Sequence, residues 1–234
     1  MEFINHGGLN QVINDLNGLI TATGVIMGTL EVCRLPQEKK RLPQQTRWLE
    51  QKLVAELTLP KIRNFLATHE FKLSPRLKRF GSLKDPIKRK TLVNLISALN
   101  LCYPEYDFSD LREKSFTRVS NLKLAQNGIN TTLNSIVDEF YPDKCELFWS
   151  QLDEVVDLDR CSVYCYVPGL SQDDPFSEIG VAWSMNYFFV NNKTKRLVFF
   201  ALQCVSFSSE CAKEMYDQEE EIEFPSWCYQ ENDY

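Results

Sequence analysis

Few residues in this sequence have the types and the spacing that catalysis requires. The only two histidines, His6 and His69, have no neighbour in the sequence that would complete a catalytic pair. The carboxylates of Asp173, Asp174 and Glu178 lie within six residues of a predicted loop, where they could serve acid–base chemistry or bind a cation. A solvated turn accounts for the same three acids. We therefore predict no enzymatic activity, and we assign these acids to a partner-binding surface.

The sequence also lacks the motifs that hold cofactors and metals. It contains no Gly-rich phosphate loop, no nucleophile-elbow serine and neither a His-Glu-x-x-His nor a Cys-x-x-Cys spacing. Cys161 and Cys165 lie four residues apart on a predicted strand, where a metal pair is one interpretation and buried free thiols are the simpler one. The N-terminus lacks the features of a signal peptide, which predicts free thiols for the eight cysteines. We expect no cofactor, no metal and no membrane-spanning segment.

The charges are segregated along the chain. Residues 34–90 hold 16 of the 26 Lys and Arg residues against five acids, a net charge of about +11. The remaining ten basic and 27 acidic residues give about −17, and residues 210–233 alone contain nine acids and one lysine. Such asymmetry indicates that the protein binds its partners through charge complementarity.

Short motifs within the basic segment predict regulation. Ser82 follows Arg79 at the spacing that basophilic kinases read, and Ser74 precedes Pro75, as a proline-directed kinase requires. A phosphate on Ser82 would add about −1.5 to −2 charges to a basic neighbourhood. Two clusters of basic residues are predicted to serve nuclear import: Lys39, Lys40 and Arg41, and Lys88, Arg89 and Lys90.

The hydrophobic pattern predicts an α+β fold, with a central antiparallel sheet packed with helices in a single globular domain. Apolar residues at helical spacing predict helices over 9–20, 92–99, 119–138 and 143–156. Aromatic and β-branched residues predict strands over 24–33, 161–167, 181–190 and 195–206, the last two joined by a turn at 191–194. Because both faces of 196–204 are apolar, this strand should be central and covered on both sides.

The charge and the prolines divide the chain into four expected segments. Within the basic segment, apolar stripes predict two further helices, near 48–57 and 62–66. The predicted segments are a first part of the core at 1–33, an inserted basic linker at 34–88, the main part of the core at 89–208 and a flexible acidic tail at 209–234.

Three stretches distinguish the sequence from a generic α+β domain. The first contains Arg89-Lys90-Thr91-Leu92 and Tyr106-Asp107-Phe108-Ser109, the second contains Asp173-Asp174-Pro175-Phe176 and Trp183 to Phe189, and the third is Lys195-Arg196-Leu197-Val198-Phe199-Phe200. In this order they resemble the Maf1 family of eukaryotic repressors of RNA polymerase III. The resemblance is strong over 89–206 and loose over 1–31.

The resemblance implies a globular α+β core that is interrupted after its first strand by a mobile, phosphorylated linker. It implies no enzymatic activity. It implies binding to RNA polymerase III near the clamp, which blocks recruitment of the polymerase to the promoter-bound initiation factor TFIIIB. It further implies kinases, phosphatases and importins as partners, and shuttling between nucleus and cytoplasm in response to nutrients, stress and TOR signalling.

Direct nucleic-acid binding through residues 34–90 is the alternative. The charge of about +11 on this segment would give salt-dependent binding to phosphates. The charge of about −17 on the rest of the chain would repel the same phosphates, so we favour the polymerase-binding repressor.

Overall fold

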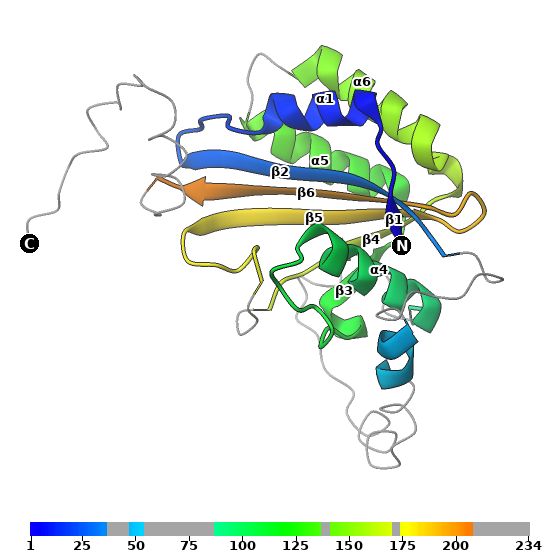
Figure 1. Ribbon diagram of the computed structural model, residues 1–234. Helices are drawn as coiled ribbons and strands as arrows, with labels where there is room; N and C mark the ends of the chain where they lie inside the picture. Colours follow the sequence, from blue (N-terminus) through cyan, green and yellow to red (C-terminus); the bar gives the residue numbers. More distant parts are fainter. Residues whose placement is uncertain (37–46, 54–86, 137–140, 170–173, 208–234) are drawn as a thin grey trace, which may run out of the picture.

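The computed structural model of the chain describes residues 1–36, 47–53, 87–136, 141–169 and 174–207. Its strands are β1 (Glu2–Phe3), β2 (Gly24–Arg34), β3 (Phe116–Val119), β4 (Ser162–Tyr166), β5 (Val181–Asn191) and β6 (Arg196–Ser206). They form one antiparallel sheet in the order β1-β2-β6-β5-β4-β3 (Figure 1). The long strands β2, β5 and β6 therefore lie next to one another at the centre, as the apolar pattern of β6 predicts.

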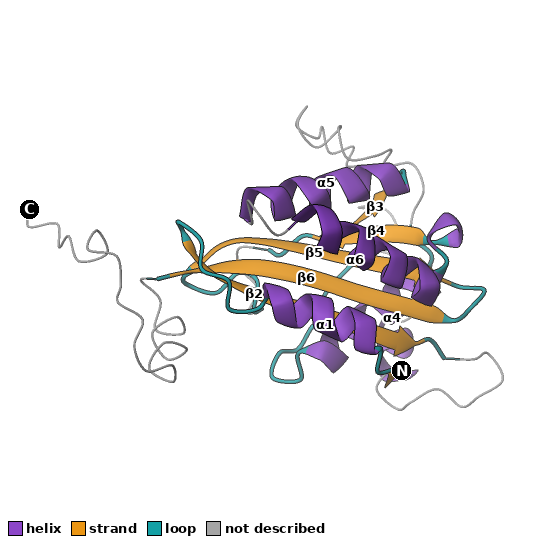
Figure 2. Cartoon of the chain, turned by 90° about the horizontal axis from the view of Figure 1, so that it is seen from above, coloured by secondary structure: helices purple, strands orange, loops and turns teal. Residues whose placement is uncertain are grey.

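Helices cover both faces of this sheet, which confirms the α+β fold. The helices α1 (Gly7–Leu16), α5 (Leu122–Ile136) and α6 (Tyr141–Val156) lie on one face, and α4 (Arg89–Cys102) lies on the other (Figures 1 and 2). Two short 3-10 helices, Glu113–Ser115 and Leu158–Arg160, precede β3 and β4. None of the helices in the described ranges is long and apolar enough to cross a membrane.

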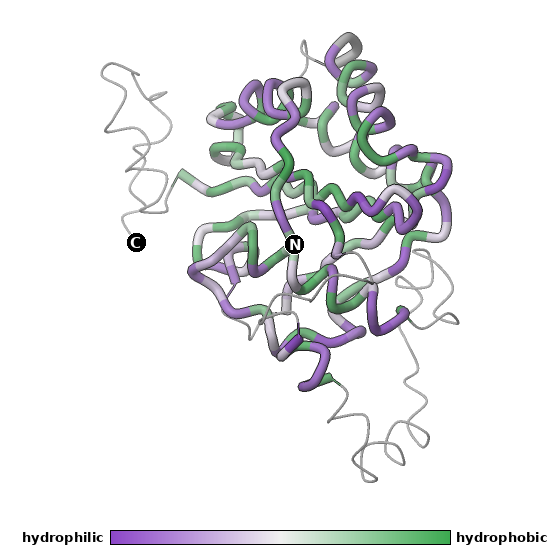
Figure 3. Tube along the Cα trace, turned by 45° about the vertical axis from the view of Figure 1, so that its right-hand side comes forward, coloured by the Kyte–Doolittle hydropathy of each residue, from purple (hydrophilic) through white to green (hydrophobic). Residues whose placement is uncertain are grey.

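The sheet separates two hydrophobic cores. We call the side of α1, α5 and α6 the three-helix layer and the side of α4 the single-helix layer. Side chains alternate along β6, so that Phe200 and Leu202 enter the three-helix layer while Phe199 and Ala201 enter the single-helix layer. The helices of the three-helix layer change between hydrophobic and hydrophilic residues along their length (Figure 3), as amphipathic helices do.

The turn between β5 and β6 is held by the buried side chain of Asn191. Its Oδ1 accepts hydrogen bonds from the backbone N–H groups of Lys193 (2.9 Å) and Thr194 (3.1 Å). Its Nδ2 donates to the carbonyl oxygen of Val156 at 2.7 Å, which fixes the hairpin to the end of α6. One asparagine thus sets both the turn and its position on the three-helix layer.

The structure differs from the predicted elements at their ends. The first helix ends at Leu16, because Gly18 takes a φ of 80° and its N–H then bonds to the carbonyl of Ile26 in β2. The predicted helix over 119–138 begins at Leu122, and residues 116–119 before it form β3. No pattern in the sequence predicts β1 and β3, since strands of two and four residues are too short for a clear period.

Part of the predicted basic linker packs on the core. Residues 47–53 are helical, and Leu49 and Leu53 are buried in the single-helix layer. Leu35 is buried as well, and its N–H donates to the carbonyl of Lys195 at 2.9 Å. The second predicted helix, near 62–66, lies outside the described residues, as does the predicted tail over 209–234. The division of the chain at residues 34 and 88 stays a prediction.

Candidate protein-interaction surface

The three acids assigned to a partner surface differ in their exposure in the structure. Asp173 lies outside the described residues. Asp174 has a relative exposure of only 1%, whereas Glu178 lies in the exposed turn that follows. The loop that carries them leads from β4 to β5 and lies on the single-helix layer (Figure 1).

The expected exposure of Asp174 is wrong, because its carboxylate is an internal anchor. Oδ2 accepts a hydrogen bond from the hydroxyl of Tyr166 at 2.8 Å, and Oδ1 accepts one from the backbone N–H of Phe176 at 2.9 Å. Burial raises the pKa of Tyr166, and the neighbouring carboxylate raises it further, so the hydroxyl remains a donor. The bond to a backbone two residues on is an Asx turn, a motif that Asp-Pro-Phe signals in the sequence.

Residues 174–181 form a braced loop. The N–H of Ser177 bonds to the carbonyl of Asp174 at 3.2 Å, and the N–H of Val181 bonds to the carbonyl of Glu178 at 3.1 Å. The carbonyl of Gly180 accepts from the N–H of Ser206 at 2.8 Å, which ties the loop to the end of β6. The loop is therefore attached to the fold at Asp174 through its side chain and at Gly180 through the backbone.

The segment that follows α4 lies against this loop. The hydroxyl of Tyr106 donates to the carboxylate of Glu178. The Asp107 carboxylate accepts from the N–H of Ser109 at 2.9 Å, and the hydrogen bonds to Ser109 lower the pKa of Asp107. Phe108 is buried, its ring centroid 6.3 Å from that of Tyr166. Residues 103–110 and 174–181 together form what we call the acidic face.

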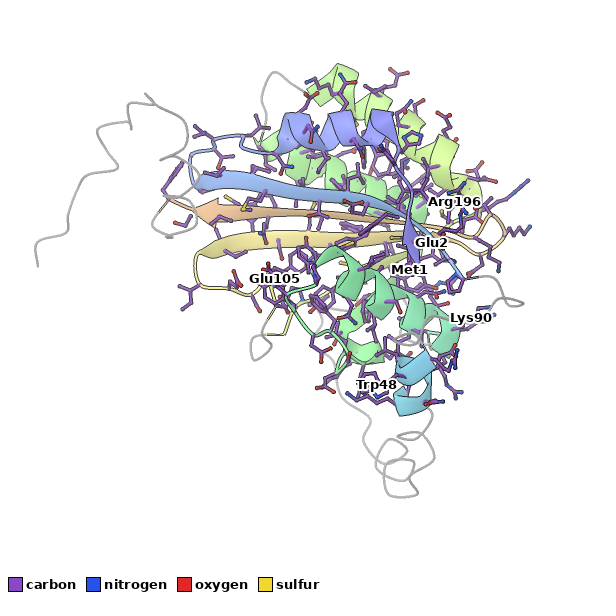
Figure 4. The ribbon with its side chains drawn as sticks, in the orientation of Figure 1. Met1, Glu2, Trp48, Lys90, Glu105 and Arg196 are labelled. Carbon is purple, nitrogen blue, oxygen red and sulfur yellow. The ribbon has the colours of Figure 1, made fainter. Side chains whose placement is uncertain are left out.

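The acidic face carries one sign of charge. Its sequence contains no Lys or Arg and contains five acids, which are Glu105, Asp107, Asp110, Asp174 and Glu178. With Asp174 buried, four acids remain near the surface. Figure 4 shows Glu105 on the same side of the sheet as α4. Such a surface complements basic partners.

A helical part of the basic segment contacts the edge of the acidic face. The Nζ atom of Lys52 lies 2.7 Å from Oδ1 of Asp110 and 4.9 Å from the ring centroid of Trp48. The side chain of Asp110 is 80% exposed, so this ion pair contributes little free energy. The pair nevertheless places the helical residues 47–53 next to the acidic face, an arrangement that the opposite charges of Lys52 and Asp110 favour.

A pocket of about 300 Å³ lies between the acidic face and the sheet. The hydroxyls of Thr29 and Tyr103 bond to each other across it at 2.9 Å, and Phe176 and Gln203 also line it. None of its lining residues is an acid or a base. Within the described residues there is no group of three or more His, Cys, Asp and Glu side chains that could hold a metal.

The cysteines in the described ranges are free thiols: Cys33, Cys102, Cys145, Cys161, Cys165 and Cys204. Burial raises the pKa of Cys33 and of Cys161 to about 12 and that of Cys165 to about 11, so these thiols stay protonated near neutral pH. At these three positions the neutral thiol, and not the more nucleophilic thiolate, is the favoured form.

The predicted regulatory residues fall mostly outside the described ranges. Ser74 and Ser82 lie there, as does the cluster Lys39, Lys40 and Arg41. The second cluster is visible and exposed, with Lys88 at the N-cap of α4 and Arg89 and Lys90 in its first turn (Figure 4). Their roles in phosphorylation and import stay predictions.

Comparison with known proteins gives consistent matches. A family model described as the Maf1 regulator matches residues 33–201 of this chain. The "Repressor of RNA polymerase III transcription" of Dictyostelium discoideum is 37% identical over 127 residues, which are 54% of this chain and 45% of that protein. The protein of that name, maf1, from Schizosaccharomyces pombe is 33% identical over 123 residues, which are 53% of this chain and 50% of that protein. The chain thus spans about half the length of these two relatives.

Solved structures agree in fold. A crystal structure of citrus MAF1 in space group P 31 2 1 superposes with a TM-score of 0.60 at 28% identity, covering 86% of this chain and 99% of that one. A second crystal form gives a TM-score of 0.61 at 29% identity, covering 85% and 98%. The family indicated by the three sequence stretches is confirmed. Since the family model matches more than half of its residues, the chain belongs to the Maf1 regulator family.

Proposed function

We propose that this chain represses transcription by RNA polymerase III. The observation that carries the proposal is the family match over residues 33–201, together with relatives whose names describe that function. The site geometry is compatible with it, because the acidic face is a surface braced by backbone hydrogen bonds, and the described residues hold no group of three or more His, Cys, Asp and Glu side chains that could bind a metal. The protein acts as a binding partner and not as an enzyme.

In the proposed mechanism, the chain binds the polymerase near its clamp and blocks recruitment to promoter-bound TFIIIB. Channel and clamp surfaces of an enzyme that holds nucleic acid are basic, so the acidic face is complementary to them in charge. Glu178 and Asp173 stay the proposed contacts from the loop. Asp174 fixes the loop that carries Glu178, through its hydrogen bonds to Tyr166 and Phe176.

Phosphorylation and nuclear import regulate the proposed repressor. Kinases and phosphatases would act on Ser82 and Ser74, and importins would read the two basic clusters. A phosphate brings negative charge into a segment whose residues 47–53 already lie beside an acid, since Lys52 pairs with Asp110. The chain would then move between cytoplasm and nucleus with nutrient supply and stress.

Order-of-addition transcription tests the proposed mechanism. Purified full-length protein is mixed with RNA polymerase III either before or after the polymerase meets a promoter that carries TFIIIB. We expect strong inhibition in the first order and weak inhibition in the second, because the recruitment step is then already complete. Equal inhibition in both orders would contradict a block of recruitment, and no inhibition in either would reject the repressor function.

A gel shift with plain duplex DNA separates this function from direct nucleic-acid binding. We expect no shift at submicromolar protein and physiological salt. A shift that disappears as salt rises would favour occlusion of the DNA by the basic segment.

A further inference from the structure

Ile179 is the most exposed large apolar side chain among the described residues. Its relative exposure is 103%, while the other exposed ones lie between 42% and 51%. Those other side chains are about half buried, whereas the whole apolar surface of Ile179 is exposed to water. Exposed apolar surface of this kind contributes nothing to folding and becomes favourable only when a partner covers it.

The backbone directs Ile179 outward. Residues 178–181 form a turn closed by the hydrogen bond from the N–H of Val181 to the carbonyl of Glu178. Gly180, in the third position, has a φ of 101°, as a type II turn requires there. Ile179 therefore occupies the second, corner position, where a side chain points away from the molecule.

The residues that precede this turn are buried and hydrogen-bonded, so the backbone that carries Ile179 is already ordered before a partner binds. Phe176 is 5% exposed, and its ring packs edge-on against Tyr103 with centroids 5.2 Å apart. The Asp174 carboxylate fixes the backbone of Phe176, and the hydroxyl of Tyr106 bonds to Glu178 directly before Ile179. Binding through a prepared loop loses little conformational entropy.

The charges around Ile179 define the chemistry of its partner. Glu178 precedes it, Glu105 and Asp107 lie on the adjoining segment, and the acidic face has no basic residue in its sequence. An exposed apolar side chain beside acidic residues is an arrangement found in interface anchors, which combine an apolar contact with a charged rim. The complementary surface has an aliphatic pocket edged by Lys or Arg side chains.

We propose that Ile179 is the apolar anchor of the acidic face and inserts into such a pocket on RNA polymerase III. This inference rests on the proposed function, because that function supplies the polymerase as the partner. It assigns the main contact to a residue next to the predicted acids, with Glu178 and Glu105 pairing with the rim of the pocket.

Equilibrium binding of the full-length chain to purified RNA polymerase III tests the anchor. The variant Ile179→Ser should bind about tenfold more weakly, as loss of a buried isoleucine implies. Ile179→Leu should bind nearly as the parent chain does. Leu124→Ser is the matched control, since Leu124 is 48% exposed on α5, on the opposite face of the sheet. Thermal melting of Ile179→Ser should be unchanged, because the side chain has no covering contacts.

The outcomes separate the anchor from the proposed function. Weak binding of Ile179→Ser, with Ile179→Leu and Leu124→Ser unaffected, supports the anchor. Equal affinity of the parent chain and Ile179→Ser overturns the anchor and leaves the polymerase-binding function standing. If the parent chain itself does not bind the polymerase, both proposals are overturned.

Discussion

The two layers on either side of the sheet are closed in different ways. In the three-helix layer, α1, α5 and α6 cover the strands with apolar side chains. In the single-helix layer, α4 covers only part of the sheet, and the acidic face and the helical residues 47–53 pack beside it (Figure 1). Of the seven buried polar residues in the described ranges, Asn191 lies in the three-helix layer and Ser115 ends the 3-10 helix before β3. The other five lie on the single-helix side: Thr91, Asn94, Ser109, Asp174 and Asn186.

Part of this difference follows from what helices and loops can supply, since Thr91 and Asn94 lie on α4 itself while Ser109 and Asp174 lie in loops. A helix satisfies its own backbone hydrogen bonds, so its backbone needs no buried polar side chain as a partner. A loop over a hydrophobic core leaves backbone groups that need partners, and buried side chains such as Asp174 provide them. The layer closed by loops is also the layer that presents the proposed binding surface.

The largest expected effect tests whether packing alone stabilises the three-helix layer. Phe148 on α6 is 2% exposed, and its ring centroid lies 5.0 Å from that of Phe200. Replacing it with alanine should lower the free energy of unfolding by about 3–5 kcal/mol, measured by urea denaturation. Leu147→Ala, at an exposed position beside it, should change this free energy by less than about 0.5 kcal/mol. Similar losses for both variants would contradict the assigned core.

The second prediction tests the polar anchor of the single-helix layer. Asp174→Ala removes the acceptor for the Tyr166 hydroxyl and the Phe176 N–H, so unfolding should become easier by about 1–3 kcal/mol. Glu178→Ala should have almost no effect on thermal melting, because its partner Tyr106 can bond to water instead. A double-mutant cycle with Tyr166→Phe measures the coupling across the bond. If Asp174→Ala left the free energy of unfolding unchanged, apolar packing alone would be sufficient to stabilise this layer.

The long helices and strands could be predicted from the sequence because each contains several repeats of its hydrophobic pattern. The strands β5 and β6 begin and end within one residue of the predicted bounds, and α4 extends the predicted 92–99 by three residues at each end. In the hairpin, Tyr187, Phe188 and Phe189 alternate between the two cores, as three consecutive aromatics on a central strand must.

The acidic face could be predicted only in part. Its acids are visible in the sequence, but charge alone does not distinguish a buried carboxylate from an exposed one, and Asp174 proves to be buried. The exposure of Ile179 has no signal in the sequence either, because sequence alone does not distinguish a buried apolar residue of a loop from an exposed one. Tertiary contacts decide both cases: the Tyr166 hydroxyl reaches Asp174, while the turn at Gly180 directs Ile179 away.

The third prediction probes the close fit of α1 on β2 in the three-helix layer. A Cβ atom added to Gly28 would lie 2.5 Å from Cδ1 of Ile13 and 2.7 Å from Cδ2 of Leu202. Both contacts are the ends of flexible side chains, so Gly28→Ala should cost about 1–2 kcal/mol in the free energy of unfolding. Combining it with Ile13→Val should recover part of this loss. An additive double variant would show that another contact is responsible.

The smallest expected effect concerns a charge at the edge of the single-helix layer. Burial raises the pKa of Glu31, on β2 opposite Phe199, above its ordinary value of 4.5. The folded state therefore binds the proton more tightly than the unfolded state, and stability falls as pH rises from about 4.5 through the raised pKa. Glu31→Gln removes this penalty, and should raise the melting temperature at pH 7 by about 1 °C, since solvent screens a half-buried carboxylate. At pH 4 the two proteins should melt alike, because Glu31 is then largely protonated in both states. A variant that melts lower than the parent chain at pH 7 would mean that the charged carboxylate has a stabilising partner.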